Sequence, residues 1–152
     1  MTAAPIRDRE RLLAAIELSR LCTRVRTAYA VGAIIADGDG GELARGYSRE
    51  TDPFDHAEES ALAKLAGVDL SRATLYTSLE PCTSRRSRPS TCTGLILIAG
   101  IRRVVFAMRE PPIFAECHGA ETLRAAGVEV LEIGDLAALV RAVNAHLFRA
   151  RS

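Results

Sequence analysis

The chain has 152 residues, of which 48% are hydrophobic and 26% are charged, and its formal net charge at pH 7 is +1. This length predicts a single domain over residues 1–152, because it is too short for a cofactor domain plus a separate substrate domain. The composition excludes a disordered chain, and no apolar run is long enough to span a membrane. The balanced charge gives no support for a surface that binds long nucleic acid.

The N-terminal segment and the cysteines indicate the compartment. Residues 1–10 carry Pro5 and four charged side chains without an apolar core, which is not typical of a signal peptide or a lipid anchor. The four cysteines could make two disulfides in a secreted protein, but a chain with a full-sized core and no export signal is expected to keep them as thiols. We therefore expect a cytoplasmic protein whose thiols serve a metal or chemistry.

Helical and strand patterns alternate along the chain. Apolar residues at helical spacing predict a first helix over 7–22, and the segments 28–36 and 42–48 around a Gly-rich turn predict a β-hairpin. The later elements are expected as a helix at 56–66, a strand at 73–77, a loop at 78–90, a helix at 91–99, a strand at 104–108, a helix at 116–126, a strand at 128–133 and a helix at 136–148. This order predicts an α/β fold, a three-layer α/β/α sandwich with a five-stranded mixed sheet.

Three side chains with metal-binding chemistry stand at two of the predicted helix starts. His56 begins the second helix, and Cys82 and Cys92 lie before and at the start of the third. One imidazole and two thiols are suitable zinc ligands, and a set of three leaves a fourth position to water, as in catalytic sites. Glu58 follows His56 by two residues, so its carboxylate can take a proton from water and pass it to a leaving nitrogen.

Each of these residues also has an ordinary structural interpretation. Glu58 fits a capping box that begins at Asp55, and His56 alone is typical of a helix terminus. Cys82 and Cys92 alone are typical of small buried apolar residues. Their joint occurrence at two helix starts favours a metal site over these separate interpretations.

The motif His-x-Glu, followed by Pro-Cys and a further cysteine, resembles that of the cytidine deaminase superfamily. Within it, the chain is similar to the pyrimidine deaminase domain of riboflavin biosynthesis, which has a Leu-Glu-Pro-Cys run and a long proline-containing loop between its cysteines. The chain departs from that domain by having nine residues and no histidine between Cys82 and Cys92, and Ala28 and Tyr29 where those enzymes carry an asparagine. The resemblance is carried by residues 31–33, 56–62, 74–82 and 99–105.

The resemblance implies a cytidine deaminase-like fold, one zinc ion per chain held by His56, Cys82 and Cys92, and Glu58 as the proton shuttle while ammonia leaves. The implied substrate is a small aminated N-heterocycle, first a riboflavin-precursor pyrimidine of the diaminohydroxyphosphoribosylaminopyrimidine type. Cytidine, deoxycytidylate, cytosine and guanine-type compounds are alternatives. A catalytically silent zinc-binding interaction module is a further alternative. Action on a base within RNA or DNA ranks low, because the chain has few aromatic residues and no Trp.

The substrate contacts are weaker expectations. Main-chain groups near Ala57 and Ser78 are expected to hold the polar edge of the ring. Arg85, Arg86 and Arg88 are expected to clamp a substrate phosphate, because guanidinium groups pair with phosphate oxygens in a bidentate manner, and a solvated charged loop is the equal alternative. Members of the superfamily usually assemble, so a homo-oligomer, a dimer or tetramer, is expected.

Overall fold

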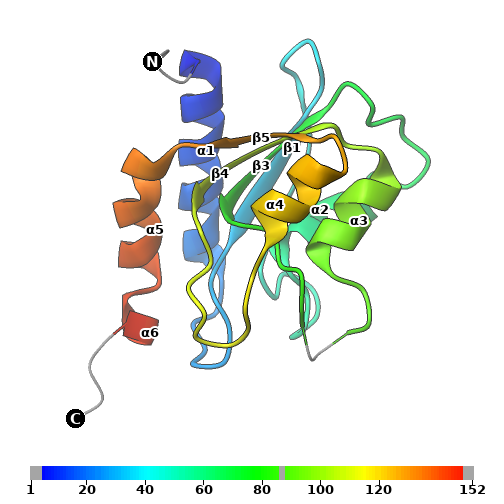
Figure 1. The fold of residues 1–152 in the computed structure, drawn as a ribbon. Helices are drawn as coiled ribbons and strands as arrows, with labels where there is room; N and C mark the ends of the chain where they lie inside the picture. The colour runs from blue at the N-terminus through cyan, green and yellow to red at the C-terminus, as the bar shows by residue number, and fades with distance from the viewer. Residues whose placement is uncertain (1–4, 86–87, 149–152) are drawn as a thin grey trace.

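A five-stranded mixed sheet lies between two layers of helices in the computed structural model, which describes residues 5–85 and 88–148 (Figure 1). The strand order is β2-β1-β3-β4-β5. β1 pairs antiparallel with β2 and β3, whereas β4 pairs parallel with β3 and β5. The strands are β1 (Gly32–Ala36), β2 (Glu42–Tyr47), β3 (Thr74–Leu79), β4 (Arg103–Met108) and β5 (Glu129–Glu132). The predicted α/β/α sandwich with a five-stranded mixed sheet is confirmed.

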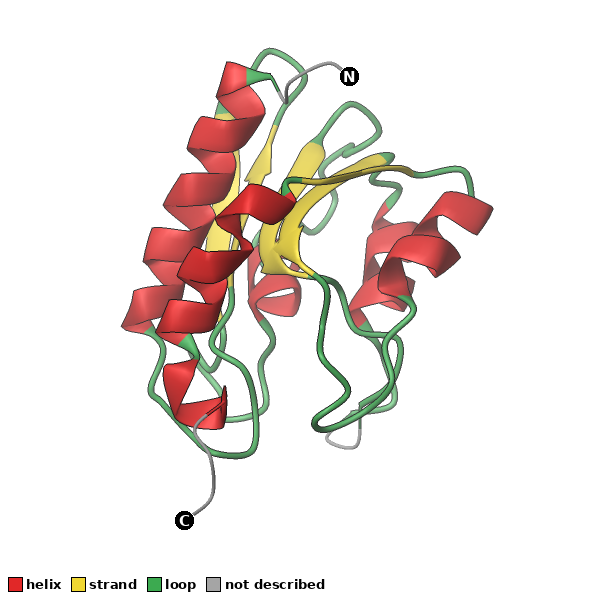
Figure 2. Cartoon of the chain, turned by 60° about the vertical axis from the view of Figure 1, so that its left-hand side comes forward, coloured by secondary structure: helices red, strands yellow, loops and turns green. Residues whose placement is uncertain are grey.

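The helices divide between the two faces of the sheet (Figure 2). One face is covered by α1 and α5, and the other by α2, α3 and α4 (Figure 1). Since β2 and β3 run in the same direction, α2 and α3, which follow them in the chain, both begin at one edge of the sheet. The helices are α1 (Ile6–Leu18), α2 (Ala57–Ala63), α3 (Cys92–Ala99), α4 (Gly119–Ala125), α5 (Ala137–Val143) and α6 (Ala145–Phe148), with 3-10 turns at Ser19–Leu21 and Gly134–Leu136.

The central strands form the core because both of their faces are covered. Ile34, Leu75, Val104 and other residues of these strands are fully buried, as expected for strands with helices on both sides. Gly46 lets α2 lie directly against β2, because a Cβ there would stand 2.6 Å from the carbonyl oxygen of Ala57. This close approach fixes where α2 begins.

A buried ion pair fastens α1 to the sheet. The guanidinium of Arg103 on β4 donates to both carboxylate oxygens of Asp8 at 2.8 and 2.6 Å, and the Tyr76 hydroxyl donates at 2.8 Å. Hydrogen bonding to Arg103 lowers the pKa of Asp8 although burial opposes it. Asp8 therefore stays charged in a place that is only 4% exposed.

Several predicted elements are shorter than expected, and the cause is visible in two of them. Residues 28–31 are not strand, because the main chain of Ala30 pairs with the side chain of Asn144 (2.7 and 3.1 Å) rather than with a neighbouring strand. The same Asn144 separates α5 from α6, so the single helix predicted at 136–148 is divided into two helices. The other predictions agree with the structure apart from their ends, where the first helix gives way to a 3-10 turn and the helix expected from 116 begins at Gly119.

The thiols agree with the sequence interpretation. All four cysteines lie in the described part of the chain and are free, and Cys22 is buried against the carbonyl of Val31. Across the described ranges, none of the helices combines the length and the apolar character that crossing a membrane requires.

Candidate metal centre

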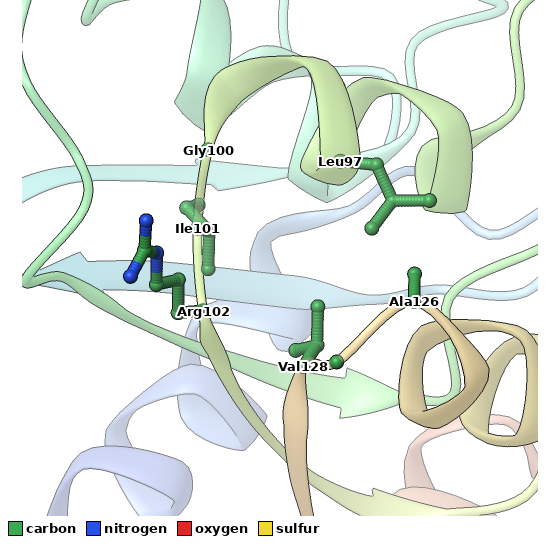
Figure 3. Close-up of a pocket in the computed structure, with 7 residues that line it drawn as sticks. Leu97, Gly100, Ile101, Arg102, Ala126 and Val128 are labelled. Carbon is green, nitrogen blue, oxygen red and sulfur yellow. The ribbon is translucent and has the colours of Figure 1, made fainter.

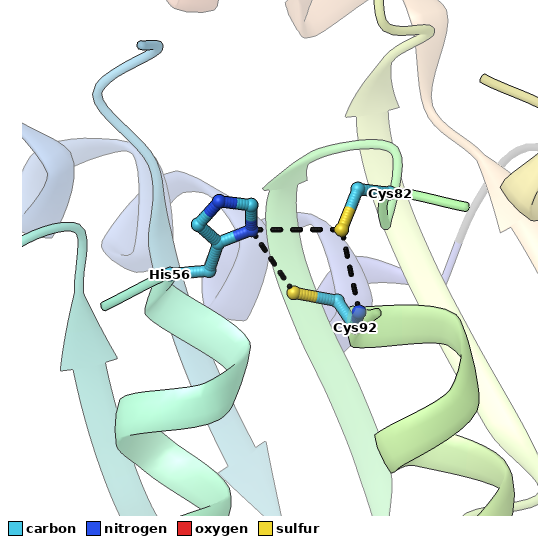
Figure 4. Close-up of side chains that lie close together, drawn as sticks. All are labelled: His56, Cys82 and Cys92. Carbon is cyan, nitrogen blue, oxygen red and sulfur yellow. Dashed lines mark hydrogen bonds between the residues drawn. The ribbon is translucent and has the colours of Figure 1, made fainter. Parts of the chain in front are cut away.

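The structure brings together the three predicted ligands, which come from three separate segments. The Nδ1 atom of His56 lies 3.2 Å from the Sγ atom of Cys92 and 3.6 Å from that of Cys82 (Figure 4). All three donor atoms lie within 4.8 Å of one another. Cys92 is fully buried and Cys82 nearly so. Among the described residues, these three side chains form a group whose donor atoms are close enough together to hold one metal ion.

Local structure places each ligand at the same edge of the sheet. His56 caps α2, and Cys92 is the first residue of α3. The Thr91 hydroxyl accepts the N–H of Gly94 at 3.1 Å, which fixes the start of α3. The main-chain N–H of Cys92 donates to the Cys82 sulfur at 3.3 Å, so the two cysteines are held face to face. The positive end of the α3 dipole favours thiolate at this point.

The donor set fits zinc. A tetrahedral zinc ion with bonds of about 2.3 Å to sulfur and about 2.0 Å to nitrogen separates neighbouring donors by about 3.6 Å. The two nitrogen-to-sulfur distances in the structure, 3.2 and 3.6 Å, are close to that value. One nitrogen and two sulfurs are the ligand types that zinc prefers. The three side chains can therefore hold a zinc ion with little rearrangement.

The protonation of the three ligands is coupled. Hydrogen bonding with Cys92 and the neighbouring His56 lower the pKa of Cys82, whereas hydrogen bonding with Cys82 and burial raise the pKa of Cys92. Burial opposes the charged form of His56, but the hydrogen bond and charge of Cys82 outweigh it and raise its pKa. One thiolate thus forms readily beside an imidazole, which suits a site that exchanges protons for a cation.

Glu58 lies in the first turn of α2, next to the ligands, and is only 4% exposed. Burial raises its pKa to about 7, with the charge of His56 and, less, hydrogen bonding to Thr77 opposing the rise. A carboxyl group with such a pKa can both take and give a proton near neutral pH. It has the properties of a general acid and base.

The remaining predicted site residues differ in their burial and in their partners. Ala57 is the first residue of α2, and Ser78 lies on β3; both are fully buried. The Ser78 hydroxyl accepts the N–H of Gly32 at 3.1 Å, so that oxygen already has a structural partner. Arg85 and Arg88 are ion-paired with carboxylates, as described below. Arg86 lies outside the described residues.

Sequence reasoning missed the carboxylates that surround the ligands. Glu80 is 2% exposed and accepts the N–H groups of Glu110 (3.1 Å) and Ala120 (2.9 Å), so it ties the segment after β4 to the strand that leads to Cys82. Burial raises the pKa of Glu110 to about 7, and the charges of Cys82 and Glu58 add to the rise. Glu110 follows the carboxyl end of β4, the edge where α/β proteins bind ligands, and that position was a usable signal.

A separate hollow lies at the opposite end of α3. It is lined by Leu97, Gly100, Ile101, Arg102, Ala126, Gly127 and Val128 (Figure 3). None of these seven side chains is an acid, a thiol or an imidazole. Since α3 begins at Cys92 and ends at Ala99, the length of the helix separates this hollow from the metal ligands.

Comparison with known protein families gives a match to the part of the chain that contains the candidate metal ligands. The family model for the cytidine and deoxycytidylate deaminase zinc-binding region matches residues 6–108. That range contains His56, Glu58, Cys82 and Cys92. Zinc is thus the metal that the matching family binds in this part of the chain.

Individual relatives agree. The chain is 36% identical over 132 residues to the diaminohydroxyphosphoribosylamino-pyrimidine deaminase of Schizosaccharomyces pombe, covering 84% of this chain and 32% of the relative. It is 38% identical over 118 residues to the riboflavin biosynthesis protein RibD of Aquifex aeolicus, covering 78% and 32%. A solved diaminohydroxyphosphoribosylaminopyrimidine deaminase/5-amino-6-(5-phosphoribosylamino)uracil reductase of Thermotoga maritima has a TM-score of 0.80 at 33% identity and covers 93% of this chain and 40% of that one. The chain thus spans about a third of the length of the two curated relatives (32% of each).

Proposed function

Because the chain belongs to the cytidine and deoxycytidylate deaminase family, we propose that it hydrolyses the amino group of a small aminated N-heterocycle. The leading substrate class is a riboflavin-precursor pyrimidine of the diaminohydroxyphosphoribosylaminopyrimidine type, since the relatives with 33–38% identity carry that name or the name of that pathway. The observation that carries the proposal is the three-ligand cluster with a buried acid beside it.

The mechanism divides between the cation and the chain. When bound to His56, Cys82 and Cys92, zinc supplies the Lewis acidity that makes water a nucleophile near neutral pH. Glu58 takes one proton as the oxygen attacks the amino-bearing ring carbon, and it then gives a proton to the leaving nitrogen. The C–N bond breaks, a C–O bond forms, and ammonia departs. The buried position of Glu58 keeps its proton from exchanging with bulk water during the step.

The chain also supplies groups that hold the ring. We propose that main-chain groups at Ala57 and Ser78 hold its polar edge, because a helix start leaves N–H groups without partners inside the helix. Ala57 is small and begins α2, which allows a flat ring to approach the main chain. The expectation that Arg85, Arg86 and Arg88 contact a substrate phosphate stays a prediction.

The remaining parts of the proposal concern the context of the enzyme. We propose one deaminase domain over residues 1–152 that works in the cytoplasm on a small molecule, not on nucleic acid, with a net charge of +1 in support. A homo-oligomer, a dimer or tetramer, is part of the proposal, because α3 exposes Leu97 and Ile98, the latter by 86%.

Ammonia release from a substrate panel tests this function. The panel contains the riboflavin-precursor pyrimidine, cytidine, deoxycytidylate, cytosine and guanine, each offered to zinc-loaded protein. We expect release from the first compound; release from another member alone would reassign the substrate, and silence on all would favour the catalytically silent zinc-binding module. Glu58→Ala should keep about one zinc per chain and lose turnover, whereas Cys82→Ser should lose zinc. Normal zinc content and turnover in both variants would contradict the site.

A further inference from the structure

The metal ligands depend on two parts of the chain that are far apart in sequence. His56 stands at the start of α2, whereas Cys82 and Cys92 flank the segment that leads into α3. Zinc affinity requires the imidazole to stay within about 3.6 Å of the sulfurs. Some contact must therefore hold the start of α2 against the segment between the cysteines.

Glu59 makes that contact with both of its carboxylate oxygens. Its Oε1 atom accepts the main-chain N–H of His56 at 3.3 Å and a guanidinium N–H of Arg85 at 3.3 Å. Its Oε2 atom pairs with Arg88 at 3.0 Å. One side chain thus touches the histidine ligand and the inter-cysteine segment. We call Glu59, Arg85 and Arg88 the Glu59 bridge.

The pair between Glu59 and Arg85 is sheltered from solvent, whereas the side chain of Arg88 is 31% exposed. The side chain of Arg85 is 3% exposed and that of Glu59 is 16% exposed. Arg85 also donates to the carbonyl oxygen of Phe54, two residues before His56, at 2.6 Å. Ion pairs with this little exposure are screened less than pairs on the surface. The contact therefore holds the segment on both sides of the ligand and not only the cap of α2.

The charges around the bridge do not favour a bound anion. Arg88 pairs with Asp52 at 3.0 Å and with Asp55 at 3.2 Å in addition to Glu59. Among the described residues, these three carboxylates face two guanidinium groups. A substrate phosphate would have to displace carboxylates that already occupy the arginines. The contacts fit a role in holding the loop better than a role in binding phosphate.

We propose that the Glu59 bridge is a positioning unit, which holds His56 at the distance from Cys82 and Cys92 that zinc requires. Its two arginines hold the segment around His56, both through Glu59 and through their own contacts with Phe54 and Asp55, and they do not touch the reacting atoms. The inference rests on the proposed function, because it assigns zinc to these three ligands. It goes beyond a capping box, since a cap needs only the contact between Glu59 and His56.

Zinc affinity in the absence of substrate tests the proposal. Glu59→Gln keeps an oxygen for the His56 N–H but loses the charge that holds the arginines. We expect Glu59→Gln and Arg85→Gln each to weaken zinc binding about 10–100-fold in competition with a chelator, as the loss of an outer partner of a metal ligand does. Because both changes break one contact, the double variant should be weaker than either single variant by much less than the product of the two losses. In the cobalt-substituted protein, the ligand-field spectrum should change in the same variants.

A control variant removes an ion pair elsewhere, which is shorter than the pairs of the bridge and more exposed. Arg45→Gln breaks the pair that Arg45 makes with Glu42 on β2 at 2.7 Å, and it should leave zinc affinity unchanged. The melting temperature of the zinc-free variants measures any general loss of folding, so that a loss of zinc affinity can be compared with it.

Three results would overturn the positioning role. The first is unchanged zinc affinity in Glu59→Gln and Arg85→Gln with a higher KM for phosphorylated substrates alone, which would make the arginines phosphate contacts. The second is fully additive losses in the double variant. The third is a loss of zinc affinity that follows the melting temperature of the zinc-free protein. If no substrate released ammonia, that result would count against the proposed deaminase activity. It would not affect the test of the bridge, because zinc affinity is measured without substrate.

Discussion

Two carboxyl groups in this protein are equally buried, and their pKa values move in opposite directions. Asp8 and Glu58 are each 4% exposed. Hydrogen bonding to Arg103 holds the pKa of Asp8 below its usual range, whereas burial raises the pKa of Glu58 to about 7. The same low exposure therefore accompanies a group that is charged at neutral pH in one place and a group that can exchange its proton there in the other.

The difference teaches that a charged partner can reverse the effect that burial alone has on the pKa of a carboxyl group. Asp8 has a guanidinium on both oxygens and serves to fasten α1. The largest effect on Glu58 is burial, and the charge of Cys82 adds to it. A cation bound by the neighbouring ligands would lower the pKa of Glu58 from there. Substitutions at Asp8 and at Glu58 can thus separate the structural role of the first from the chemical role of the second.

The largest effect is expected for Glu58→Gln. The amide has nearly the same shape but cannot carry the proton, so turnover should fall by about 10²–10⁴-fold while zinc content stays unchanged. The free energy of unfolding should not fall, because an uncompensated buried acid is replaced by a neutral group. Steady-state rates, metal analysis and urea unfolding measure the three quantities. Equal turnover in the variant and the parent would remove Glu58 from the mechanism.

Asp8→Asn should give the reverse pattern. The variant loses the charge that pairs with Arg103, which keeps Glu129 as a partner at 2.8 Å. We expect the free energy of unfolding to fall by about 2–3 kcal/mol, with zinc affinity and turnover at permissive temperature unchanged. Urea unfolding and chelator competition on the same sample provide the check. A fall in zinc affinity without a fall in stability would contradict the separation of the two regions.

Tyr76→Phe should have a smaller effect on the same cluster. It removes one hydrogen bond to the charged Asp8 and leaves Arg103 in place. A loss of about 1.5 kcal/mol is expected from urea unfolding, at the lower end of what hydrogen bonds to charged groups contribute. In the Asp8→Asn background the same change should cost less, because the acceptor is no longer charged. Identical costs in both backgrounds would show that the hydroxyl does not act through Asp8.

The smallest effect is a pH dependence. The pKa of Asp8 is lower in the folded state than in the unfolded chain, so the unfolded chain binds more protons as the pH falls. The contribution of Asp8 is complete above the unfolded pKa of about 3.9 and is lost as the pH falls through the folded pKa. Between about pH 5 and pH 3, the parent should therefore lose more stability than Asp8→Asn. Parallel curves for the two proteins would contradict the assignment.

Local patterns in the sequence were enough to predict the sheet, the starts of α2 and α3 and the three side chains that the structure brings together. Thr91 and Gly100 bound α3 through a cap and a left-handed turn, both of which depend on neighbouring residues only. His56 and Cys92 stand at helix starts for the same local reason. The strands were predictable because continuous apolar runs are typical of a sheet covered on both faces.

Contacts between distant residues were not predictable in this way. Ala30 pairs with Asn144, which is 114 positions away, and the first four residues of the strand expected at 28–36 are lost from it as a result. Glu59 meets Arg85 across 26 positions, through a loop whose path no periodic pattern describes. The sequence showed three arginines near the site but could not show that the two described ones are already paired with carboxylates.

The pairing of Asn144 with Ala30 bears on where the folding unit ends. The amide of Asn144 donates to the Ala30 carbonyl and accepts its N–H, as a neighbouring strand would, and Asn144 is fully buried. The family match stops at residue 108, yet a truncation there would remove Asn144 together with α4, β5 and α5, so that the peptide group of Ala30 would lose its partner and the sheet part of its cover. A fragment that ends at the family boundary should therefore be insoluble. The smallest fragment that folds on its own should extend at least through residue 144.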